Sequence, residues 1–461
     1  MGLKMQNNST VQNLTNSVRS QEVTMNPNSL VVGGGIAGIQ AALDIAGAGH
    51  KVYLVEREPW IGGHVMQLSK LFTTLVSPLD AITPKMTAVT RHPNIELMTY
   101  SEVEGVSGRV GNFMVKLKQR PRFVDETKCN GCGLCIHKCP QEVDSEFDIG
   151  LGKRRAIYIP YSQAIPNIPA IDREHCLYFQ NGTCEACKKI CEPKAIDFQQ
   201  ADRIAEISVG AVILATGYHL FDPSVMPLYG YKKYDNILTS LEFERICSAT
   251  GPTGGEILVK NGTPPESVAI IHCVGSRDKN YHEYCSRVCC MYALKYSHLI
   301  MEKTNARVYQ MYIDMRCFGE GHEEFYNRIS EKGASFIRGK VARITEGVAE
   351  EEGKLIVYVE DTLLGDMLQV PVDMVILCAA ITPRADADKV ANLFSISQRE
   401  DGFFMEKDAK LELVATPIDG IFIAGCCQSP KDISDTVTQA KGAASEVLVL
   451  LSQGKGSGDK K

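Results

Sequence analysis

Residues 30–38 read Leu-Val-Val-Gly-Gly-Gly-Ile-Ala-Gly, and this stretch decides the fold of the first domain. An apolar strand runs into three successive glycines, and an alanine-rich helix follows to about Gly49. A second apolar strand, Val52–Val55, ends at the acidic residue Glu56, 18 residues after Gly38. The pattern predicts a βαβ unit with a Gly-x-Gly-x-x-Gly turn between its first strand and its helix.

Each glycine of this turn has its own physical role. Gly33 permits the tight turn, Gly35 lets the backbone approach a pyrophosphate, and Gly38 lets helix and strand pack closely. The helix N-terminus, which includes Ala37, offers N–H groups and the positive end of a dipole to phosphates. We expect Glu56 to accept hydrogen bonds from an adenosine ribose. The turn therefore predicts a dinucleotide site.

Two later motifs favour FAD over NAD as that dinucleotide. A strand expected at Ile207–Ala215 ends in Ala215-Thr216-Gly217, as in flavoprotein reductases. Residues 420–425 (Gly-Ile-Phe-Ile-Ala-Gly) resemble the late flavin motif, whose next residue is usually Asp and is here Cys426. Because a helix follows, Gly425 and Cys426 suit a flavin phosphate or the pyrimidine edge.

Composition limits the remaining possibilities. The 461 residues are 44% hydrophobic and 23% charged with a net charge of −6, which gives no electrostatic footprint for nucleic acid or an anionic membrane. No apolar stretch approaches the ~20 residues that span a bilayer. Residues 1–28 are polar and lack the apolar segment of a secretory signal. We therefore expect a cytoplasmic protein with a disordered or partner-docking N-terminal tail.

The 17 cysteines are the most informative feature of the composition. In a large cytosolic chain such a set more often binds metal than forms disulfides. One run has the bacterial ferredoxin spacing C-x2-C-x2-C-x3-C-P, and a second run has the spacing C-x7-C-x2-C-x3-C. The eight residues are Cys129, Cys132, Cys135, Cys139, Cys176, Cys184, Cys187 and Cys191.

In two-cluster ferredoxins the fourth cysteine of each run ligates the cluster of the other run. The spacing therefore predicts one [4Fe-4S] cluster on Cys129, Cys132, Cys135 and Cys191. It predicts a second on Cys176, Cys184, Cys187 and Cys139. Tetrahedral zinc is the alternative, since it also uses paired Cys-x-x-Cys, but two interlocked quartets argue against it.

A third group of cysteines consists of Cys273, Cys285, Cys289 and Cys290, and it follows an expected strand at Val268–His272. A two-nucleotide reductase fold would place its second glycine turn at this point, for NAD(P)H. The turn at 273–278 reads Cys-Val-Gly-Ser-Arg-Asp and lacks those glycines. The sequence therefore predicts that the nicotinamide site is lost and that a cluster replaces it. On spacing alone, buried structural thiols remain an equal interpretation.

These motifs together resemble the A-type subunit of heterodisulfide reductase over roughly residues 28–450, and the A-type subunit of the quinone-interacting membrane-bound oxidoreductase is a related family. The most specific stretches include 61–64 (Ile-Gly-Gly-His), 251–255 (Gly-Pro-Thr-Gly-Gly) and 284–292 (Tyr-Cys-Ser-Arg-Val-Cys-Cys-Met-Tyr). The resemblance implies a thioredoxin-reductase-like FAD fold with an inserted ferredoxin domain, and a third [4Fe-4S] cluster on the Cys273 group.

The resemblance also concerns single residues near the flavin. Arg57, Gly62, Gly63 and His64 complete the expected cofactor-binding set. A lysine just after the double cysteine is a candidate catalytic partner of flavin N5 in that family, and the matching residue is Lys295. A cation there would stabilise a reduced flavin, whereas an exposed helix lysine is the alternative.

The family implies a role in electron transfer, with electron pairs split at the flavin. Implied partners are heterodisulfide reductase B- and C-like subunits and a ferredoxin, hydrogenase or formate dehydrogenase donor, around a homodimer. Relatives carry two cysteines where this chain has Ser77 and Asp80, so the cluster shared with their N-terminal domain is expected to be lost. Rival interpretations are a quinone-linked module of sulfur metabolism, an assembly scaffold without turnover, and an NAD(P)H-dependent disulfide reductase.

We thus expect an α/β chain with a two-nucleotide-domain disulfide-reductase fold and an inserted α+β ferredoxin domain. The expected segments are a tail (1–28), FAD-binding parts (29–120, 204–264 and 386–452), the ferredoxin insert (121–203), a second nucleotide-binding-like domain (265–385) and a flexible tail (453–461). The vicinal pair Cys426 and Cys427 is expected to pack near the flavin and not to form a catalytic disulfide.

Overall fold

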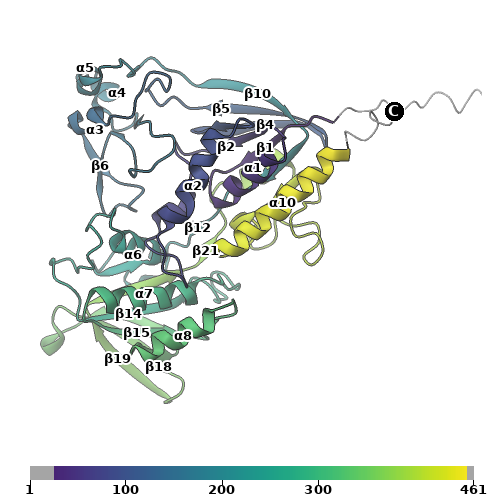
Figure 1. Ribbon diagram of the computed structural model, residues 1–461. Coiled ribbons are helices and arrows are strands. Elements are labelled where there is room, and N and C mark those ends of the chain that lie inside the picture. Colours follow the sequence, from purple (N-terminus) through teal and green to yellow (C-terminus); the bar gives the residue numbers. More distant parts are fainter. Residues whose placement is uncertain (1–24, 454–461) are drawn as a thin grey trace, which may run out of the picture.

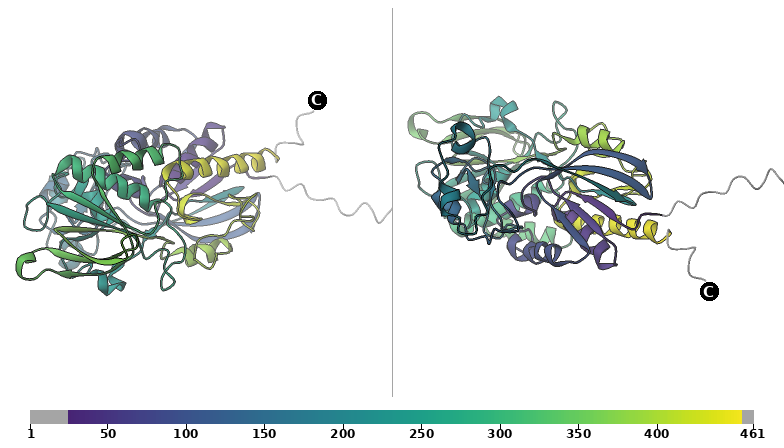
Figure 2. Two further views of the ribbon diagram at one scale, coloured as in Figure 1. Left: turned by 90° about the horizontal axis from the view of Figure 1, so that it is seen from below. Right: turned by 90° about the horizontal axis from the view of Figure 1, so that it is seen from above.

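A computed structural model describes residues 25–453 of the chain (Figure 1). Most of the expected N-terminal tail and residues 454–461 of the C-terminal tail lie outside the described residues. Two parallel sheets dominate the fold and lie towards opposite ends of the long axis, as the green and the purple and yellow parts of Figure 2 show. No helix within residues 25–453 is long and apolar enough to cross a membrane.

The first sheet has five parallel strands in the order β22-β11-β1-β2-β3. They are β1 (Ser29–Val32), β2 (Val52–Val55), β3 (Ile95–Met98), β11 (Ala211–Leu214) and β22 (Ile421–Ile423). The helices α1 (Ile36–Gly47), α2 (Pro78–Arg91) and α10 (Ile433–Gln453) share one hydrophobic core with this sheet. The predicted βαβ unit is therefore present, and the late segment of the chain returns to complete it.

An antiparallel sheet, β10-β5-β4, packs beside the first sheet and carries the insert. Its strands are β4 (Ser101–Arg109), β5 (Asn112–Gln119) and β10 (Arg203–Val209). The single strand expected at 207–215 is wrong, because β10 and β11 belong to different sheets. A Cβ at Gly210, between them, would lie 2.2 Å from the backbone oxygen of Asn26, so the chain changes sheets where only glycine fits.

The insert, defined here as residues 120–202, lies between β5 and β10 and stands at the upper left of Figure 1. Its elements are short: α3 (Leu134–Lys138), β6 (Glu142–Asp144), β7 (Lys153–Arg155), β8 (Ile157–Tyr158), β9 (Ala170–Ile171), α4 (Leu177–Asn181) and α5 (Ala186–Ile190). Cysteine side chains form a large part of its small hydrophobic core. Packing of these elements therefore depends on the cysteines themselves.

The second sheet is also parallel, in the order β13-β20-β14-β15-β16. It comprises β13 (Ile237–Thr239), β14 (Ser267–Val274), β15 (Arg307–Tyr312), β16 (Ser335–Arg338) and β20 (Met374–Ala379), with helices α6 (Ser240–Cys247), α7 (Cys289–Lys303) and α8 (His322–Glu331). The antiparallel sheet β17 (Val341–Glu346), β18 (Leu355–Asp361) and β19 (Asp366–Val372) packs on it. This is the two-sheet α/β architecture that the sequence predicts.

Short elements complete the chain. The pair β12 (His219–Leu220) and β21 (Ile381–Thr382) lies where the chain passes between the two bodies, and α9 (Ala387–Phe394) packs against the β10-β5-β4 sheet. The 3-10 helices are η1 (Gly63–Gln67), η2 (Pro223–Val225), η3 (Pro227–Tyr229), η4 (Ala349–Glu351) and η5 (Gly425–Cys427).

Candidate functional site

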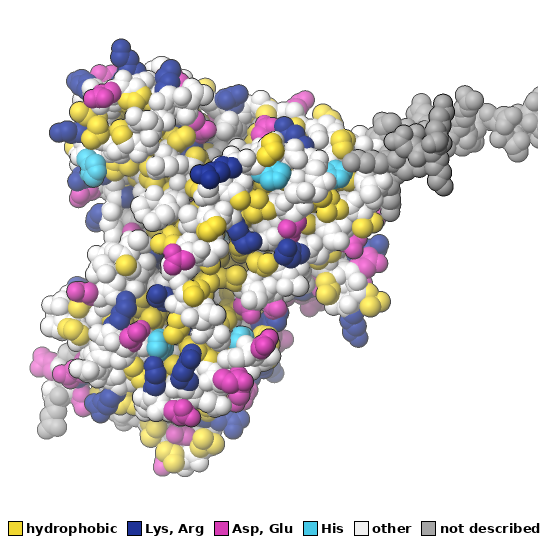
Figure 3. Space-filling view, in the orientation of Figure 1, with side chains coloured by type: hydrophobic (Ala, Val, Ile, Leu, Met, Phe, Trp, Pro, Cys, Tyr) yellow, Lys and Arg dark blue, Asp and Glu magenta, His cyan; other side chains and the backbone are white. Residues whose placement is uncertain are grey.

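A cleft of about 1670 Å³ lies where the first sheet, the insert and α7 meet. Hydrophobic side chains show on the face in Figure 3 where the upper and lower parts of the molecule meet. Most of the residues predicted to bind a dinucleotide line this cleft: Gly33, Gly35, Ala37, Glu56, Arg57, Gly62, Gly63, His64, Ala215, Thr216, Gly217 and Cys426. Gly38 and Gly425, which were also predicted, are not among the residues that line the cleft.

The glycine turn has the shape that a bound pyrophosphate requires. A Cβ at Gly38 would lie 1.8 Å from the Gly33 oxygen, and one at Gly33, whose φ is +115°, would lie 2.2 Å from the Ala215 oxygen. A Cβ at Gly35 would meet nothing within 4 Å, so the backbone before α1 faces open space. Two glycines are thus required for packing and one leaves a cradle at a helix N-terminus, which fits FAD.

Glu56 lies at the end of β2 and faces the same cleft. Its carboxylate accepts hydrogen bonds from the N–H groups of Gly34 (2.6 Å) and Glu58 (2.7 Å). Burial raises the pKa of Glu56, and these two hydrogen bonds oppose that rise because they favour the charged form. Arg57, the next residue, forms a 2.9 Å ion pair with Asp386.

His64, on η1, contacts the segment that follows β11 at the cleft. Its Nδ1 lies 2.7 Å from Gln67 Oε1, and its Nε2 lies 3.1 Å from the Tyr218 carbonyl oxygen. The Gln67 amide is oriented by donating to the Phe147 carbonyl, so its Oε1 accepts. Burial lowers the pKa of His64, which favours the neutral ring, and a neutral ring has one N–H and donates to only one of these two oxygens at a time. The imidazole thereby holds the Gly62-Gly63 turn beside Gly217.

Lys295, which lies on α7, lines the same cleft. The residue is 1% exposed, so the alternative of a solvent-exposed helix lysine does not match the structure. Its Nζ donates to the Lys70 carbonyl oxygen (2.9 Å) and forms an ion pair with Glu244 on α6. The other oxygen of Glu244 accepts from the backbone N–H (2.8 Å) and the hydroxyl (2.7 Å) of Ser69.

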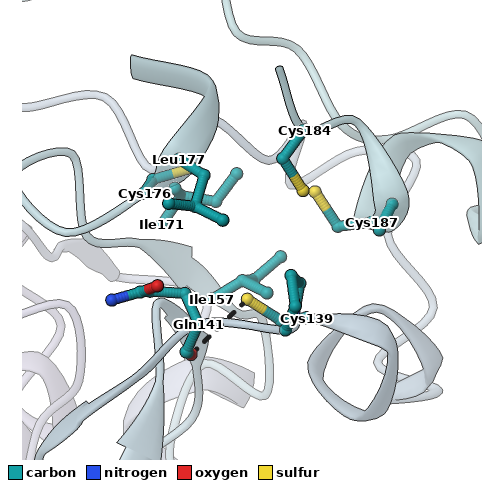
Figure 4. A pocket seen from close by; sticks show the side chains of 10 residues that line it. Cys139, Gln141, Ile157, Ile171, Cys176, Leu177, Cys184 and Cys187 are labelled. Carbon is teal, nitrogen blue, oxygen red and sulfur yellow. Dashed lines mark hydrogen bonds between the residues drawn. The ribbon is translucent and has the colours of Figure 1, made fainter. Parts of the chain in front are cut away.

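The second cysteine quartet of the insert surrounds a small cavity. In Figure 4 the sulfur atoms of Cys184 and Cys187 point toward each other, and that of Cys139 points toward the Gln141 carbonyl oxygen. The four residues are Cys139, Cys176, Cys184 and Cys187, so the fourth cysteine of the first run joins the second quartet. This is the crossed arrangement expected from the spacing.

The first quartet consists of Cys129, Cys132, Cys135 and Cys191. Burial, together with charge on the other three sulfurs, raises the pKa of Cys135 to about 12. Thiolates gathered in this way require a cation to remain charged, which is what a metal cluster supplies. All 17 cysteines are free of disulfides.

The third cysteine group lies directly behind the cleft. Cys273 ends β14 with a φ of +57°, and Cys289 and Cys290 begin α7. The adjacent Cys289 thiol lowers the pKa of both Cys273 and Cys290. Cys285 accepts a hydrogen bond from the Arg287 N–H (3.3 Å). The structure thus brings all four residues to the end of β14 and the start of α7.

Three polar atoms beside Cys273 are buried without a hydrogen-bond partner in the described part of the chain. They are His272 Nδ1, Ser276 Oγ and Arg277 Nη1. Buried polar groups in proteins are nearly always paired, so a concentration of unpaired ones indicates a missing partner. A cluster with sulfide and thiolate acceptors fits this place.

Comparison with known proteins identifies the family. The FAD dependent oxidoreductase family model matches residues 29–127, and the 4Fe-4S binding domain model matches residues 122–143. The A-type iron-sulfur subunit of the CoB–CoM heterodisulfide reductase of Methanocaldococcus jannaschii is 49% identical over 94% of this chain and 65% of that protein. The second such protein of Methanopyrus kandleri is 48% identical over 96% of this chain and 67% of its own length.

The chain belongs to the family of heterodisulfide reductase A-type subunits. It spans about two thirds of the length of the curated relatives. Its family matches give it an FAD dependent oxidoreductase domain and a 4Fe-4S binding domain. The predicted family and fold class are thereby confirmed.

A solved structure supports the fold of this heterodisulfide reductase A-type subunit. The thioredoxin reductase of Lactococcus lactis aligns with a TM-score of 0.51 at 14% identity, covering 92% of this chain and 99% of that one. At this identity the likeness concerns the fold alone.

Two residues of the site in this A-type subunit were not predicted from the sequence. Glu244 and Ser69 lie 175 residues apart in the chain and meet only in the folded protein. A usable signal was present in α6, where the charged residues Glu242, Glu244 and Arg245 alternate with apolar residues in a helix that is buried along its whole length. Buried charges require partners, so such a helix indicates a buried polar network.

Proposed function

We propose that this chain is an electron-transfer subunit of a cytoplasmic heterodisulfide-reductase-like complex, with one FAD and three [4Fe-4S] clusters. Electrons pass between the two ferredoxin-type clusters, the flavin and a third cluster on the Cys273 group. Bound FAD can exchange electrons in pairs or singly, whereas a [4Fe-4S] cluster exchanges them one at a time. The observation that carries this proposal is the position of α7.

Helix α7 borders both the cleft and the third cysteine group. Cys289 and Cys290 form its first turn, and Lys295 reaches the cleft from the same helix. Tyr292 lies between them, since it lines the cleft and interacts electrostatically with Cys289. Tyr292 therefore borders both the cleft and the cysteine group.

The connection from β14 to α7 supports the loss of a nicotinamide site. In this connection, residues 275–288, the structure has no helix that begins directly after the strand. A Cβ at Gly275 would lie 2.3 Å from the Phe221 ring, so this glycine allows packing and leaves no cradle. It differs in this respect from Gly35, which faces open space.

The insert offers a corresponding path to the cleft from the other side. Ile171 lines both the cavity of the second cysteine quartet and the large cleft. Asp172 and Arg173, which follow it, also line the cleft. We therefore propose that the second quartet holds the cluster nearer to FAD and that the first quartet, with its exposed Cys132, faces outward.

Residues that line the cleft have defined roles in this proposal. Lys295 holds a positive charge at Nζ, and Glu244 fixes that atom in place. The turn at Gly62 and Gly63 closes on the glycine loop, since the Gly62 N–H donates to the Gly34 oxygen (2.8 Å). These groups orient the cofactor and keep water from its reacting edge.

The names of the relatives support a proposal about the partners. The Methanothermobacter marburgensis relative, 44% identical, is named as the A-type subunit of an H(2):CoB-CoM heterodisulfide,ferredoxin reductase. We propose that B- and C-like subunits accept electrons from this chain, that a ferredoxin, hydrogenase or formate dehydrogenase exchanges electrons with it, and that electron pairs are split at the flavin of a homodimer. Co-purification from the native cell with identification of the bound chains tests these partners.

The cofactor content tests the central proposal. We expect one FAD and about twelve iron atoms per chain after anaerobic purification, from three four-iron clusters. A Cys290→Ala variant should retain about eight, whereas Cys378→Ala, a buried neighbour outside the group, should retain about twelve. About eight iron atoms in the unaltered protein would remove the third cluster. Rapid bleaching of the flavin by NADPH alone would restore the disulfide-reductase interpretation.

A further inference from the structure

Arg277 has one guanidinium nitrogen that is anchored and one that is unused. Nη2 donates to Asp314 Oδ2 at 2.7 Å. Nη1 is buried and has no hydrogen-bond partner in the described part of the chain. The residue also has a φ of +52°, in the left-handed region that a bulky side chain rarely adopts. A strained backbone and an unsatisfied buried donor at one residue indicate a functional constraint.

The unused end of Arg277 lies beside the third cysteine group. Both Cys273 and Cys285 interact electrostatically with its guanidinium. Asp314 lies against both groups, because its carboxylate holds Arg277 and its backbone oxygen lies 3.8 Å from Cys290 Sγ. The guanidinium and one of the cysteine sulfurs therefore contact the same residue.

Two other arginines in the neighbourhood differ from Arg277. Arg287 forms a 2.9 Å ion pair with Asp435 and its side chain is 40% exposed. Arg338 shares the Asp314 carboxylate at 3.4 Å, and its side chain is 48% exposed. Neither has a buried nitrogen without a partner. Solvent screens their charges, whereas the Arg277 Nη1 lies in the protein interior.

We propose that Arg277 donates its Nη1–H to the iron–sulfur cluster on the Cys273 group and sets the reduction potential of that cluster. The inference rests on the third cluster of the proposed function. Reduction adds negative charge to the cluster, so a nearby cation and N–H donor stabilise the reduced form and raise the potential. Arg277 is a positioning and tuning residue, with Asp314 as its anchor.

A redox titration of the third cluster tests this role. The cluster signal is assigned by paramagnetic resonance as the one that a Cys290→Ala variant lacks. In Arg277→Gln we expect the ratio of reduced to oxidised cluster at a fixed potential to fall about tenfold, which is about 59 mV for one electron. Arg277→Lys keeps the charge and should shift less in the same direction. Arg338→Gln, the matched control on the same carboxylate, should leave the ratio unchanged.

The outcomes separate a failure of the proposed role of Arg277 from a failure of the proposed third cluster. An unchanged midpoint in Arg277→Gln, with the third signal intact, overturns the role of Arg277 and leaves the cluster in place. A third signal that is missing from the unaltered protein overturns the proposed cluster itself. If Arg277→Gln loses the cluster, Arg277→Lys decides, because an unchanged midpoint there overturns the inference and a lowered one supports it.

Discussion

Lys295 and Glu244 form a buried ion pair at the end of the cleft, with each side chain only 2% exposed. The two residues come from α7 and α6, and Ser69 binds the second oxygen of the carboxylate from a loop after η1. A buried charge is tolerated when it is paired and hydrogen-bonded. The pair therefore joins three segments of the chain while keeping one cation at the cleft.

Lys295→Met should separate the structural from the electronic role of this pair. The substitution leaves the Glu244 carboxylate buried without its cation, so we expect the free energy of unfolding to fall by about 3–5 kcal/mol. The double variant Lys295→Met/Glu244→Gln removes both charges and should recover most of that loss, as urea unfolding would show. The reduction potential of the flavin should be lower in both variants than in the unaltered protein, because both lack the Lys295 cation. A normal flavin potential in the double variant would show that Lys295 does not act on the flavin.

Gly35→Ala and Gly38→Ala should impair different properties of the protein. A Cβ at Gly38 clashes with the Gly33 oxygen, so Gly38→Ala should lower the thermal stability of the flavin-free protein. A Cβ at Gly35, whose φ is −76°, meets no protein atom, so Gly35→Ala should fold normally and bind FAD more weakly. Equilibrium dialysis with FAD measures the second effect. Equal FAD affinity in Gly35→Ala and unaltered protein would mean that no pyrophosphate lies at this turn.

Paired substitutions should reveal the crossed ligation of the insert. If Cys139 serves the Cys176 quartet, Cys139→Ala/Cys176→Ala damages one cluster and costs about four iron atoms per chain. Cys139→Ala/Cys129→Ala damages both clusters and costs about eight. Iron analysis of anaerobically purified protein compares the two variants. The reverse order of losses would indicate that each run keeps its own fourth cysteine.

Much of this site was predictable because its signals are local. The roles of Gly33 and Gly38 follow from one turn, and the ferredoxin quartets follow from spacings within short loops. The environment of Lys295 was not predictable, since its partners lie 51 and 225 residues away along the chain. The strand expected at 268–272 extends to Val274, and the register shift after Ile271 belongs to tertiary packing. Long-range contacts therefore limited the prediction.

Cys426 replaces the aspartate usual at the end of the flavin motif, and its thiol should remain protonated at neutral pH. Burial raises its pKa to about 11, so at pH 7 the thiolate fraction is about one in 10,000, from the difference of 4 pH units. Its Sγ faces the Lys431 oxygen (3.5 Å), whereas Cys427 Sγ faces the Leu214 oxygen (3.3 Å). The two sulfurs therefore bind different acceptors, which opposes a catalytic disulfide.

Alkylation should report this protonation state directly. With iodoacetamide and flavin-free protein, the labelling rate of the Cys426 peptide should rise about tenfold per pH unit from neutrality towards pH 11, because only the thiolate reacts. Bound FAD should slow the labelling, since Cys426 lines the cleft. Cys426→Ser supplies the control for assigning the peptide by mass spectrometry. Rapid labelling at pH 7, or a Cys426–Cys427 disulfide in the native protein, would show instead that this position is redox-active.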